Sequence, residues 1–330
     1  MRLLIARHLK ASVIAGVACV AVAASAAAST GPATPSQVAA DVASSVSITT
    51  LPSNLAPALG SAQNDTAYVG TPTLAACNTP GTTLKTSRCV FGDKKGTKTM
   101  VLWGDSHAFM WFPAVNAVAK SAHWKLVALL KYGCPVASVS VWDGVSKVPY
   151  KVCDTFRANM IAAINRLNPS LVIVTEAFTS LAASGGGAYN TITTAQWQTG
   201  LTKTLKALHS TRMKKLIIGN TIASGAKGLA YPPQCLIVNT ATVQKCTIQD
   251  TPVQQAQRAS EVAAAKATST TYVDALPWLC TTPSPGSCSS VIGDSVNGYK
   301  VVYYSTGHIT ETYALFLATV LGNALKPHMH

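Results

Sequence analysis

Short apolar runs alternate with segments of helical periodicity over most of the chain beyond residue 98. The apolar runs predict buried strands, and apolar residues spaced three or four apart predict helices with one buried face. The predicted strands are 99–103, 125–130, 171–175, 215–219 and 271–274, and the predicted helices are 108–122, 154–167, 195–209, 253–267 and 310–325. This alternation predicts an α/β fold, a three-layer sandwich in which helices cover both faces of a five-stranded parallel sheet.

The N-terminal region departs from this pattern. Residues 1–28 predict a secretory signal peptide, because basic residues precede an uncharged, mostly apolar run that ends in small residues suited to cleavage. That run is nearly long enough to cross a bilayer, so an uncleaved N-terminal anchor is the alternative. Residues 29–66 are rich in Ala, Ser, Thr and Pro, which predicts a linker. We therefore expect a single domain over 67–330 in a secreted or cell-wall-associated protein.

The cysteines support export. Of the nine, Cys19 lies in the predicted signal, and the other eight form an even set, which in an exported chain indicates disulfides. Eight cysteines allow 105 pairings, but these fall into local couples around loop-like segments, and we predict four local bridges. Zinc binding is the alternative, but the cysteines lack CxxC spacing and clustered histidines, so no metal site is expected. The predicted pairs are Cys77–Cys89, Cys134–Cys153, Cys235–Cys246 and Cys280–Cys288.

Composition narrows the class of partner. The chain carries 26 basic and 12 acidic residues, a formal charge of +14, yet only 12% of its residues are charged, against about 25% in ordinary soluble domains. Such a composition excludes a coiled coil and a chain held open by its own charge. The positive charge suggests a polyanion, but the basic residues are scattered and lack an aromatic platform. We therefore expect no nucleic-acid partner.

Candidate chemistry follows the first predicted strand. Ligands of parallel α/β sheets bind beyond the carboxyl ends of the strands, and there the chain reads Gly104-Asp105-Ser106-His107. A serine at a strand-to-helix turn exposes its hydroxyl beside backbone N–H groups that suit an oxyanion, although the same residues also form ordinary turns. A nucleophilic serine needs a base, and His308, in a predicted loop before the last helix, is the best-placed histidine.

Several further motifs occur in the order expected for one family. Together with the cysteines they make the chain similar to the SGNH domains that are fused to membrane acyltransferases of family three in actinobacteria, here as a stand-alone secreted domain. The resemblance covers roughly residues 77 to 325 and implies an SGNH, flavodoxin-like fold. The matching segments are Val101 to Ala108 with Trp111 and Pro113, Gly133-Cys134-Pro135, Phe156-Arg157, Gly219-Asn220-Thr221, Pro233 to Leu236, Asp274 with Pro277 to Cys280, Val291-Ile292-Gly293, and His308-Ile309-Thr310 with Tyr313-Ala314.

The resemblance implies a role for each matching residue. Ser106 is the expected nucleophile and His308 the expected base, with the Ser106 amide and Gly133 as oxyanion donors. Such domains hydrolyse O-acyl esters of carbohydrates or pass the acyl group to a sugar hydroxyl. The expected partner is therefore a cell-envelope glycan or an acylated sugar, with a membrane acyltransferase as a further candidate, and no cofactor is implied. Trp142, in the loop closed by Cys134 and Cys153, is the candidate for stacking on a sugar.

Two departures from the family pattern bear on activity. Ser305 stands where the family has the aspartate that orients the histidine, and Glu176 stands in the segment where an asparagine is expected. Loss of the orienting acid costs a serine hydrolase on the order of 10⁴ in rate. The remaining candidates for orienting the ring of His308 are a backbone carbonyl, Ser305, Asp105 and Glu176. The alternative hypothesis is a degenerate, non-catalytic domain that binds glycan or a membrane acyltransferase.

Overall fold

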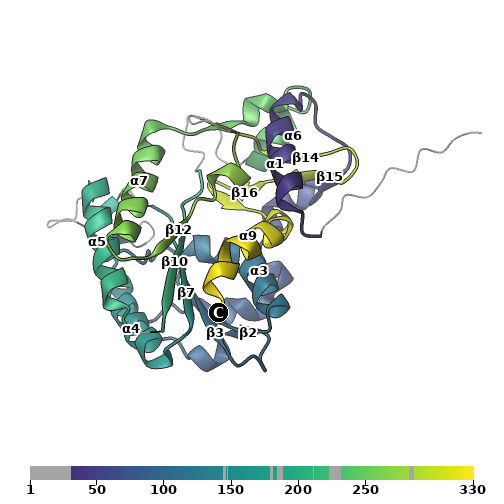
Figure 1. The fold of residues 1–330 in the computed structure, drawn as a ribbon. Helices are drawn as coiled ribbons and strands as arrows, with labels where there is room; N and C mark the ends of the chain where they lie inside the picture. The colour runs from purple at the N-terminus through teal and green to yellow at the C-terminus, as the bar shows by residue number, and fades with distance from the viewer. Residues whose placement is uncertain are drawn as a thin grey trace, which may run out of the picture.

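A six-stranded sheet lies at the centre of the protein (Figure 1). The computed structural model describes residues 31–143, 146, 148–178, 181–183, 189–210, 212–222, 232–281 and 286–330, so the predicted signal peptide, 1–28, lies outside the described residues. The sheet has the order β12-β10-β7-β3-β4-β2. These strands are β2 (Val90–Gly92), β3 (Thr99–Gly104), β4 (Lys125–Leu130), β7 (Leu171–Thr175), β10 (Lys214–Ile218) and β12 (Thr271–Val273).

The five predicted strands are confirmed, and all of them run parallel. The sixth strand, β2, pairs antiparallel with β4 at the edge of the sheet. The sequence pattern missed it because it is three residues long and follows directly on the Cys77–Cys89 loop. The parallel strands have the flavodoxin-like order, in which the chain reverses direction across the sheet beside the first strand, here β3, and ligands bind at this point.

Helices cover both faces of the sheet (Figure 1). Along β3, Met100 and Leu102 point into one core, and Val101 and Trp103 point into the other, as the alternation of side chains along a strand requires. The first core contains residues of α3 (Ser106–Ser121), α8 (Glu311–Phe316) and α9 (Ala318–Leu325). The second contains residues of α4 (Lys151–Leu167), α5 (Thr194–Ala207) and α7 (Pro252–Lys266). The three-layer prediction is therefore confirmed, and the helix predicted over 310–325 is divided at Leu317.

The predicted linker, 29–66, is wrong for the part that the structure describes. Helix α1 (Pro35–Ser44) begins at the N-cap Thr34 and buries Val38 and Val42 in the first core. Strand β1 (Leu55–Ala56) then pairs parallel with β15 (Gly298–Val301), which is also paired with β14 (Val291–Asp294). The composition of the segment did not indicate this packing, because two buried valines, spaced four apart, are sufficient to anchor a short helix.

The same N-terminal segment braces the start of α8. The backbone carbonyl of Asp65 accepts a hydrogen bond from Glu311 N at 2.9 Å, and its carboxylate accepts one from Thr312 N at 2.9 Å. In return, Glu311 Oε2 accepts a hydrogen bond from Gly70 N, in α2 (Ala67–Gly70), at 3.1 Å. These contacts fix the first turn of α8, three residues beyond His308.

Local disulfides close the loops around this frame. All four predicted pairings are confirmed, with Cα–Cα distances between 4.0 and 5.7 Å. Disulfides are typical of oxidising compartments, so they indicate an extracytoplasmic location. Within the described ranges, no helix has the length and apolar character needed to cross a bilayer.

A buried carboxyl lies beside the ends of β10 and β12. Glu261, on α7, is 1% exposed, and its Oε2 accepts hydrogen bonds from Asn220 N at 3.1 Å and the Tyr272 hydroxyl at 3.2 Å. Burial raises the pKa of this carboxyl to about 8, although both hydrogen bonds act in the opposite direction. The folded protein therefore keeps a proton here that the unfolded chain releases.

Replacing Val38 by Ala tests whether the N-terminal segment belongs to the fold. Because Val38 is 1% exposed, Val38→Ala is expected to lower the free energy of unfolding by about 1.5–3 kcal/mol, measured by urea denaturation followed by circular dichroism. The control is Val46→Ala, since Val46 is 46% exposed and its change is expected to stay within about 0.5 kcal/mol. Equal, small effects at both positions would show that this segment is a detachable linker.

Replacing Glu261 by Gln tests whether the buried carboxyl of Glu261 keeps its proton in the folded protein. Between pH 5 and pH 7 the unfolded chain, with a carboxyl pKa of about 4.3, has lost the proton that folded Glu261 retains, so stability falls as the pH rises. Glu261→Gln, which preserves the acceptor oxygen, is expected to reduce this slope by about 1.4 kcal/mol per pH unit. Urea denaturation across this range measures it. The half-exposed Asp154→Asn is the control, and parallel slopes in wild type and Glu261→Gln would contradict the expectation.

Candidate active site

A tight turn joins β3 to α3 and carries the predicted nucleophile. Gly104 ends β3, and a Cβ at this position would collide with the backbone carbonyl of Thr175 in β7, so the close approach of the two strands requires glycine. Ser106 is the first residue of α3 and is partly exposed. Its N–H belongs to the first turn of the helix, where amides lack an intrahelical acceptor. The serine thus stands at the carboxyl edge of the sheet with a free backbone donor.

Asp105 holds this turn in place. Its carboxylate is buried, with Oδ1 accepting a hydrogen bond from His107 N at 2.9 Å and Oδ2 accepting one from Ala177 N at 2.8 Å. Burial raises the pKa of Asp105 to about 7, against the effect of these two bonds. Asp105 therefore caps α3 and ties the end of β3 to the end of β7. Both carboxylate oxygens serve the turn, so Asp105 positions Ser106 and does not orient His308.

A backbone carbonyl and a hydroxyl orient His308. The ring nitrogen Nδ1 lies 3.0 Å from the carbonyl oxygen of Thr306 and 3.0 Å from Ser305 Oγ. A carbonyl oxygen can only accept a hydrogen bond, so Nδ1 of His308 must carry the proton and donate it. The lone pair of the neutral imidazole is then on Nε2, which is where a general base requires it. Burial lowers the pKa of His308, and the Thr306 carbonyl opposes this shift. The ring is thus held in its basic form at neutral pH.

His308 does not lie in a plain loop: it begins β17 (His308–Ile309), which pairs antiparallel with β16 (Tyr303–Ser305). The loop of this hairpin and the strand after it are attached to two other elements. Thr221, just beyond β10, donates a hydrogen bond from Oγ1 to the carbonyl of Gly307 at 2.6 Å. Ile309 N donates to Met110 Sδ, on α3, at 3.4 Å. Gly307 has a φ of 75°, a conformation that favours glycine. Sequence reasoning missed these supports, although Thr221 lies in the Gly219-Asn220-Thr221 motif that it had singled out.

The loop brings His308 against the first turn of α3. Its ring centroid lies 5.1 Å from that of His107, the residue after Ser106, with the two rings at 76°. Burial lowers the pKa of His107 far below its usual value, so this neighbour is neutral. No hydrogen bond joins Ser106 Oγ to His308 in the described structure. Such bonds are often long without substrate and tighten when it binds.

Gly133 occupies the adjacent strand end. Lys131 N donates to the Gly104 carbonyl at 3.1 Å, which draws the chain beyond β4 toward the serine turn. Gly133 has a φ of 63°, and a Cβ built on it would meet no atom within 4 Å. Gly133 therefore lies at an open position three residues beyond the end of β4, the strand next to β3, and its role as an oxyanion donor remains a prediction.

Glu176 does not reach His308. The side chain is 1% exposed, and its Oε2 accepts a hydrogen bond from Ala137 N at 2.8 Å. Burial raises the pKa of this carboxyl well above its usual value, and the nearby Asp105 adds to the rise. Glu176 thus fixes the segment that follows Gly133. In the described structure Glu176 is bonded to Ala137 N through Oε2, and its Oε1 is buried without a hydrogen-bond partner, so no observed contact supports the interpretation of Glu176 as the group that orients the histidine.

Trp142 is not an open platform. It lies in β5 (Trp142–Asp143), which pairs with β6 (Val148–Pro149), and it is 9% exposed.

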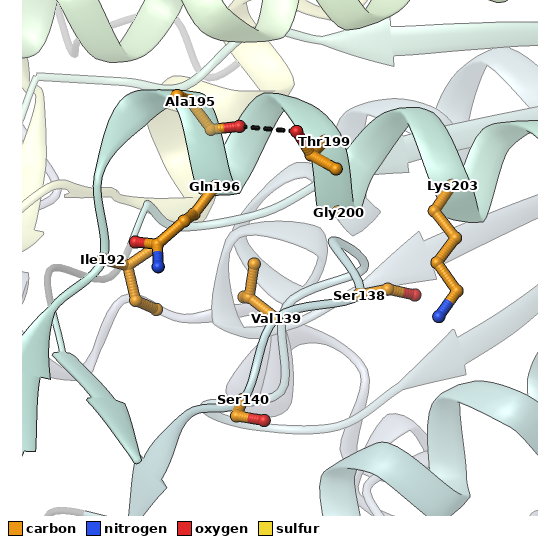
Figure 2. Close-up of a pocket in the computed structure, with 9 residues that line it drawn as sticks. All are labelled: Ser138, Val139, Ser140, Ile192, Ala195, Gln196, Thr199, Gly200 and Lys203. Atoms are coloured by element: carbon orange, nitrogen blue, oxygen red, sulfur yellow. Dashed lines mark hydrogen bonds between the residues drawn. The ribbon is translucent and has the colours of Figure 1, made fainter. Parts of the chain in front are cut away.

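A groove of about 590 Å³ lies between residues 138–140 and α5, and Figure 2 shows its lining, from Ser138 to Lys203. Neither Ser106 nor His308 contributes to this groove. Among the residues that the structure describes, no cluster of histidine, cysteine and acidic side chains is suited to a metal ion.

Comparison with known proteins identifies the family of this chain. Residues 76–323 match the family described as the SGNH domain fused to AT3 domains. Among solved structures, the periplasmic domain of a lipopolysaccharide acetyltransferase from Salmonella ser. Paratyphi A is similar, with a TM-score of 0.55 and 15% identity over 79% of this chain and 97% of that one. At this identity the likeness shows the fold alone, and no curated protein matches significantly. Since the family match spans most of the chain, the protein belongs to the SGNH domains of the type fused to AT3 domains.

Proposed function

We propose that this protein is a serine O-acyl esterase or O-acyltransferase that acts on cell-envelope carbohydrate. The observation that carries the proposal is the orientation of His308, whose Nδ1 is engaged by the Thr306 carbonyl while the ring lies against the first turn of α3. The SGNH family consists generally of serine esterases and acyltransferases. The structural relative is a lipopolysaccharide acetyltransferase domain, which supports a carbohydrate substrate.

The proposed reaction has two steps. Ser106 Oγ attacks the acyl carbon while its proton passes to His308 Nε2, and the amides of Ser106 and Gly133 donate to the oxyanion. The tetrahedral intermediate collapses to an acyl-serine, and His308 returns the proton to the departing sugar oxygen. Water, or the hydroxyl of a second sugar, then attacks the acyl-serine with His308 again as base, which releases the acid or the new ester and restores Ser106.

The carbonyl replaces only part of what an aspartate provides. The Thr306 oxygen fixes the tautomer and the orientation of the ring, but as a neutral acceptor it stabilises the imidazolium less than a carboxylate. We therefore expect a slower enzyme than one with a complete triad.

A second candidate function is non-catalytic binding of glycan or of a membrane acyltransferase. It is favoured by Ser305 at the position of the orienting acid and by the lack of a hydrogen bond between Ser106 and His308 in the described structure. In either case we propose a secreted or cell-wall-associated protein, with retention of the N-terminal segment as an anchor as the alternative.

Removal of the nucleophile tests the serine mechanism. Ser106→Ala is expected to lower kcat/KM for hydrolysis of para-nitrophenyl acetate at least about 100-fold, because the acyl-serine no longer forms. Circular dichroism and the urea midpoint serve as folding controls, and Ser44→Ala in α1 is the matched serine variant. Equal turnover by wild type and Ser106→Ala would exclude the serine mechanism and favour the binding domain.

Restoring an acid tests the orientation of His308. Burial lowers the pKa of wild-type His308 from its usual value, so kcat/KM is expected to rise with pH on the acidic side and to be level around neutral pH. In Ser305→Asp a carboxylate beside Nδ1 stabilises the imidazolium and raises the pKa of His308. The acidic side of the kcat/KM profile is therefore expected to shift to higher pH by about one pH unit or more. The rate at pH 8 is expected to rise at least about tenfold.

Ser305→Asn is the matched control. Asparagine has nearly the same shape as aspartate but carries no charge. The acidic side of the kcat/KM profile of Ser305→Asn is therefore expected to coincide with that of wild type. An unchanged limb in Ser305→Asp, measured as kcat/KM between pH 5 and pH 9, would show that His308 does not act as the base through this arrangement.

A further inference from the structure

Four aromatic side chains border the candidate active site. Tyr132 stacks on Phe109 with ring centroids 4.5 Å apart at 20°, and Tyr68 contacts both rings, at 4.7 Å from Phe109 and 5.7 Å from Tyr132. Phe109 lies three residues beyond Ser106 on α3, so the two share a helix face. The fourth ring, that of Tyr304, lies 5.4 Å from the ring of His308. These rings therefore extend along the edge that carries the nucleophile and the base.

Tyr132 is the exposed member of this group. It is 40% exposed, whereas Phe109 beneath it is 2% exposed. Among the residues whose side chains the structure describes, it is the only exposed aromatic one. It also directly precedes Gly133, the candidate oxyanion donor. The most exposed aromatic side chain among the described residues thus lies next to the residue that is expected to bind the ester carbonyl.

The backbone of Tyr132 is held from several directions. Its N–H donates to Asn78 Oδ1 at 3.2 Å, and its carbonyl accepts a hydrogen bond from the Tyr150 hydroxyl at 3.4 Å. Next to it, the buried ammonium of Lys131 donates to the carbonyls of Thr79, Pro80 and Gly81 at 2.7 to 3.2 Å. Because the backbone and the inner ring are both fixed, the exposed ring is preorganised, which lowers the entropic cost of binding.

A sugar ring matches this surface. A pyranose presents C–H groups on its faces and hydroxyls around its rim, and tyrosine combines an aromatic face with a polar tip. An ester whose carbonyl oxygen is bound by Gly133 N–H carries its sugar next to the neighbouring residue. We infer that Tyr132, together with Tyr304, forms the subsite for the pyranose ring that bears the acyl group. This inference rests on the proposed function and replaces Trp142 as the site of sugar stacking.

Comparing two acetate esters tests the subsite. One substrate is a mixture of O-acetylated methyl gluco-, galacto- and mannopyranosides, and the other is triacetin, which has no ring. Tyr132→Leu is expected to lower the ratio of their kcat/KM values about tenfold, mainly through KM for the pyranosides. Tyr132→Phe, which keeps the ring, is expected to change the ratio less than about threefold. Tyr299→Leu, on β15 at a distance from the site, is the control for loss of a tyrosine.

The outcomes separate this inference from the proposed function. Equal losses on both esters in Tyr132→Leu would assign Tyr132 a purely structural role, and an unchanged ratio would show that sugar does not contact it; either overturns the subsite. If wild type hydrolyses neither ester, the proposed function fails, and saturation-transfer NMR with the unacetylated pyranosides decides the subsite separately. Binding by wild type that is lost in Tyr132→Leu supports it, and no binding by wild type overturns it.

Discussion

The arrangement of the candidate site depends on one buried carboxylate. Asp105 accepts hydrogen bonds from His107 N and Ala177 N, so a single side chain both caps α3 and joins the carboxyl ends of β3 and β7. Gly104 permits the close approach of these strands, and its carbonyl accepts the hydrogen bond that brings in the chain beyond β4. Ser106 is therefore positioned by the geometry of the sheet, and the chain that leads to Gly133 is tied to the end of β3 by the Lys131 N–H.

The histidine reaches this edge from a different part of the molecule. Its loop is held by Thr221 from the end of β10 and by Met110 from α3, and the helix that follows is braced by Asp65. Within the loop, the Thr306 carbonyl fixes the imidazole. The protein thus orients His308 by backbone geometry, and this requires a rigid surrounding because a neutral carbonyl supplies little electrostatic attraction.

The proposed substrate side of the site is the segment around Gly133. Lys131 binds three carbonyls of the loop that the Cys77–Cys89 disulfide closes, and Glu176 binds the segment beyond Gly133 through Ala137. Burial of a polar group is unfavourable unless hydrogen bonds compensate for its lost hydration. The Lys131 ammonium and Glu176 Oε2 are paired in this way, whereas Glu176 Oε1 is buried without a partner. The paired atoms hold the backbone on both sides of Gly133, next to the exposed ring of Tyr132.

The five parallel strands, the serine turn and the local disulfides were predictable from sequence, because each depends on residues that are close together in the chain. His308 was the expected base because of its place before the last helix and because the resemblance to SGNH domains gives it that role. Only the tertiary structure decided what orients it, because a backbone carbonyl leaves no trace in residue identity. The same holds for the packing of Val38, the burial of Trp142 and the direction of Glu176. Each is set by contacts between segments far apart in sequence, which periodicity along the chain does not encode.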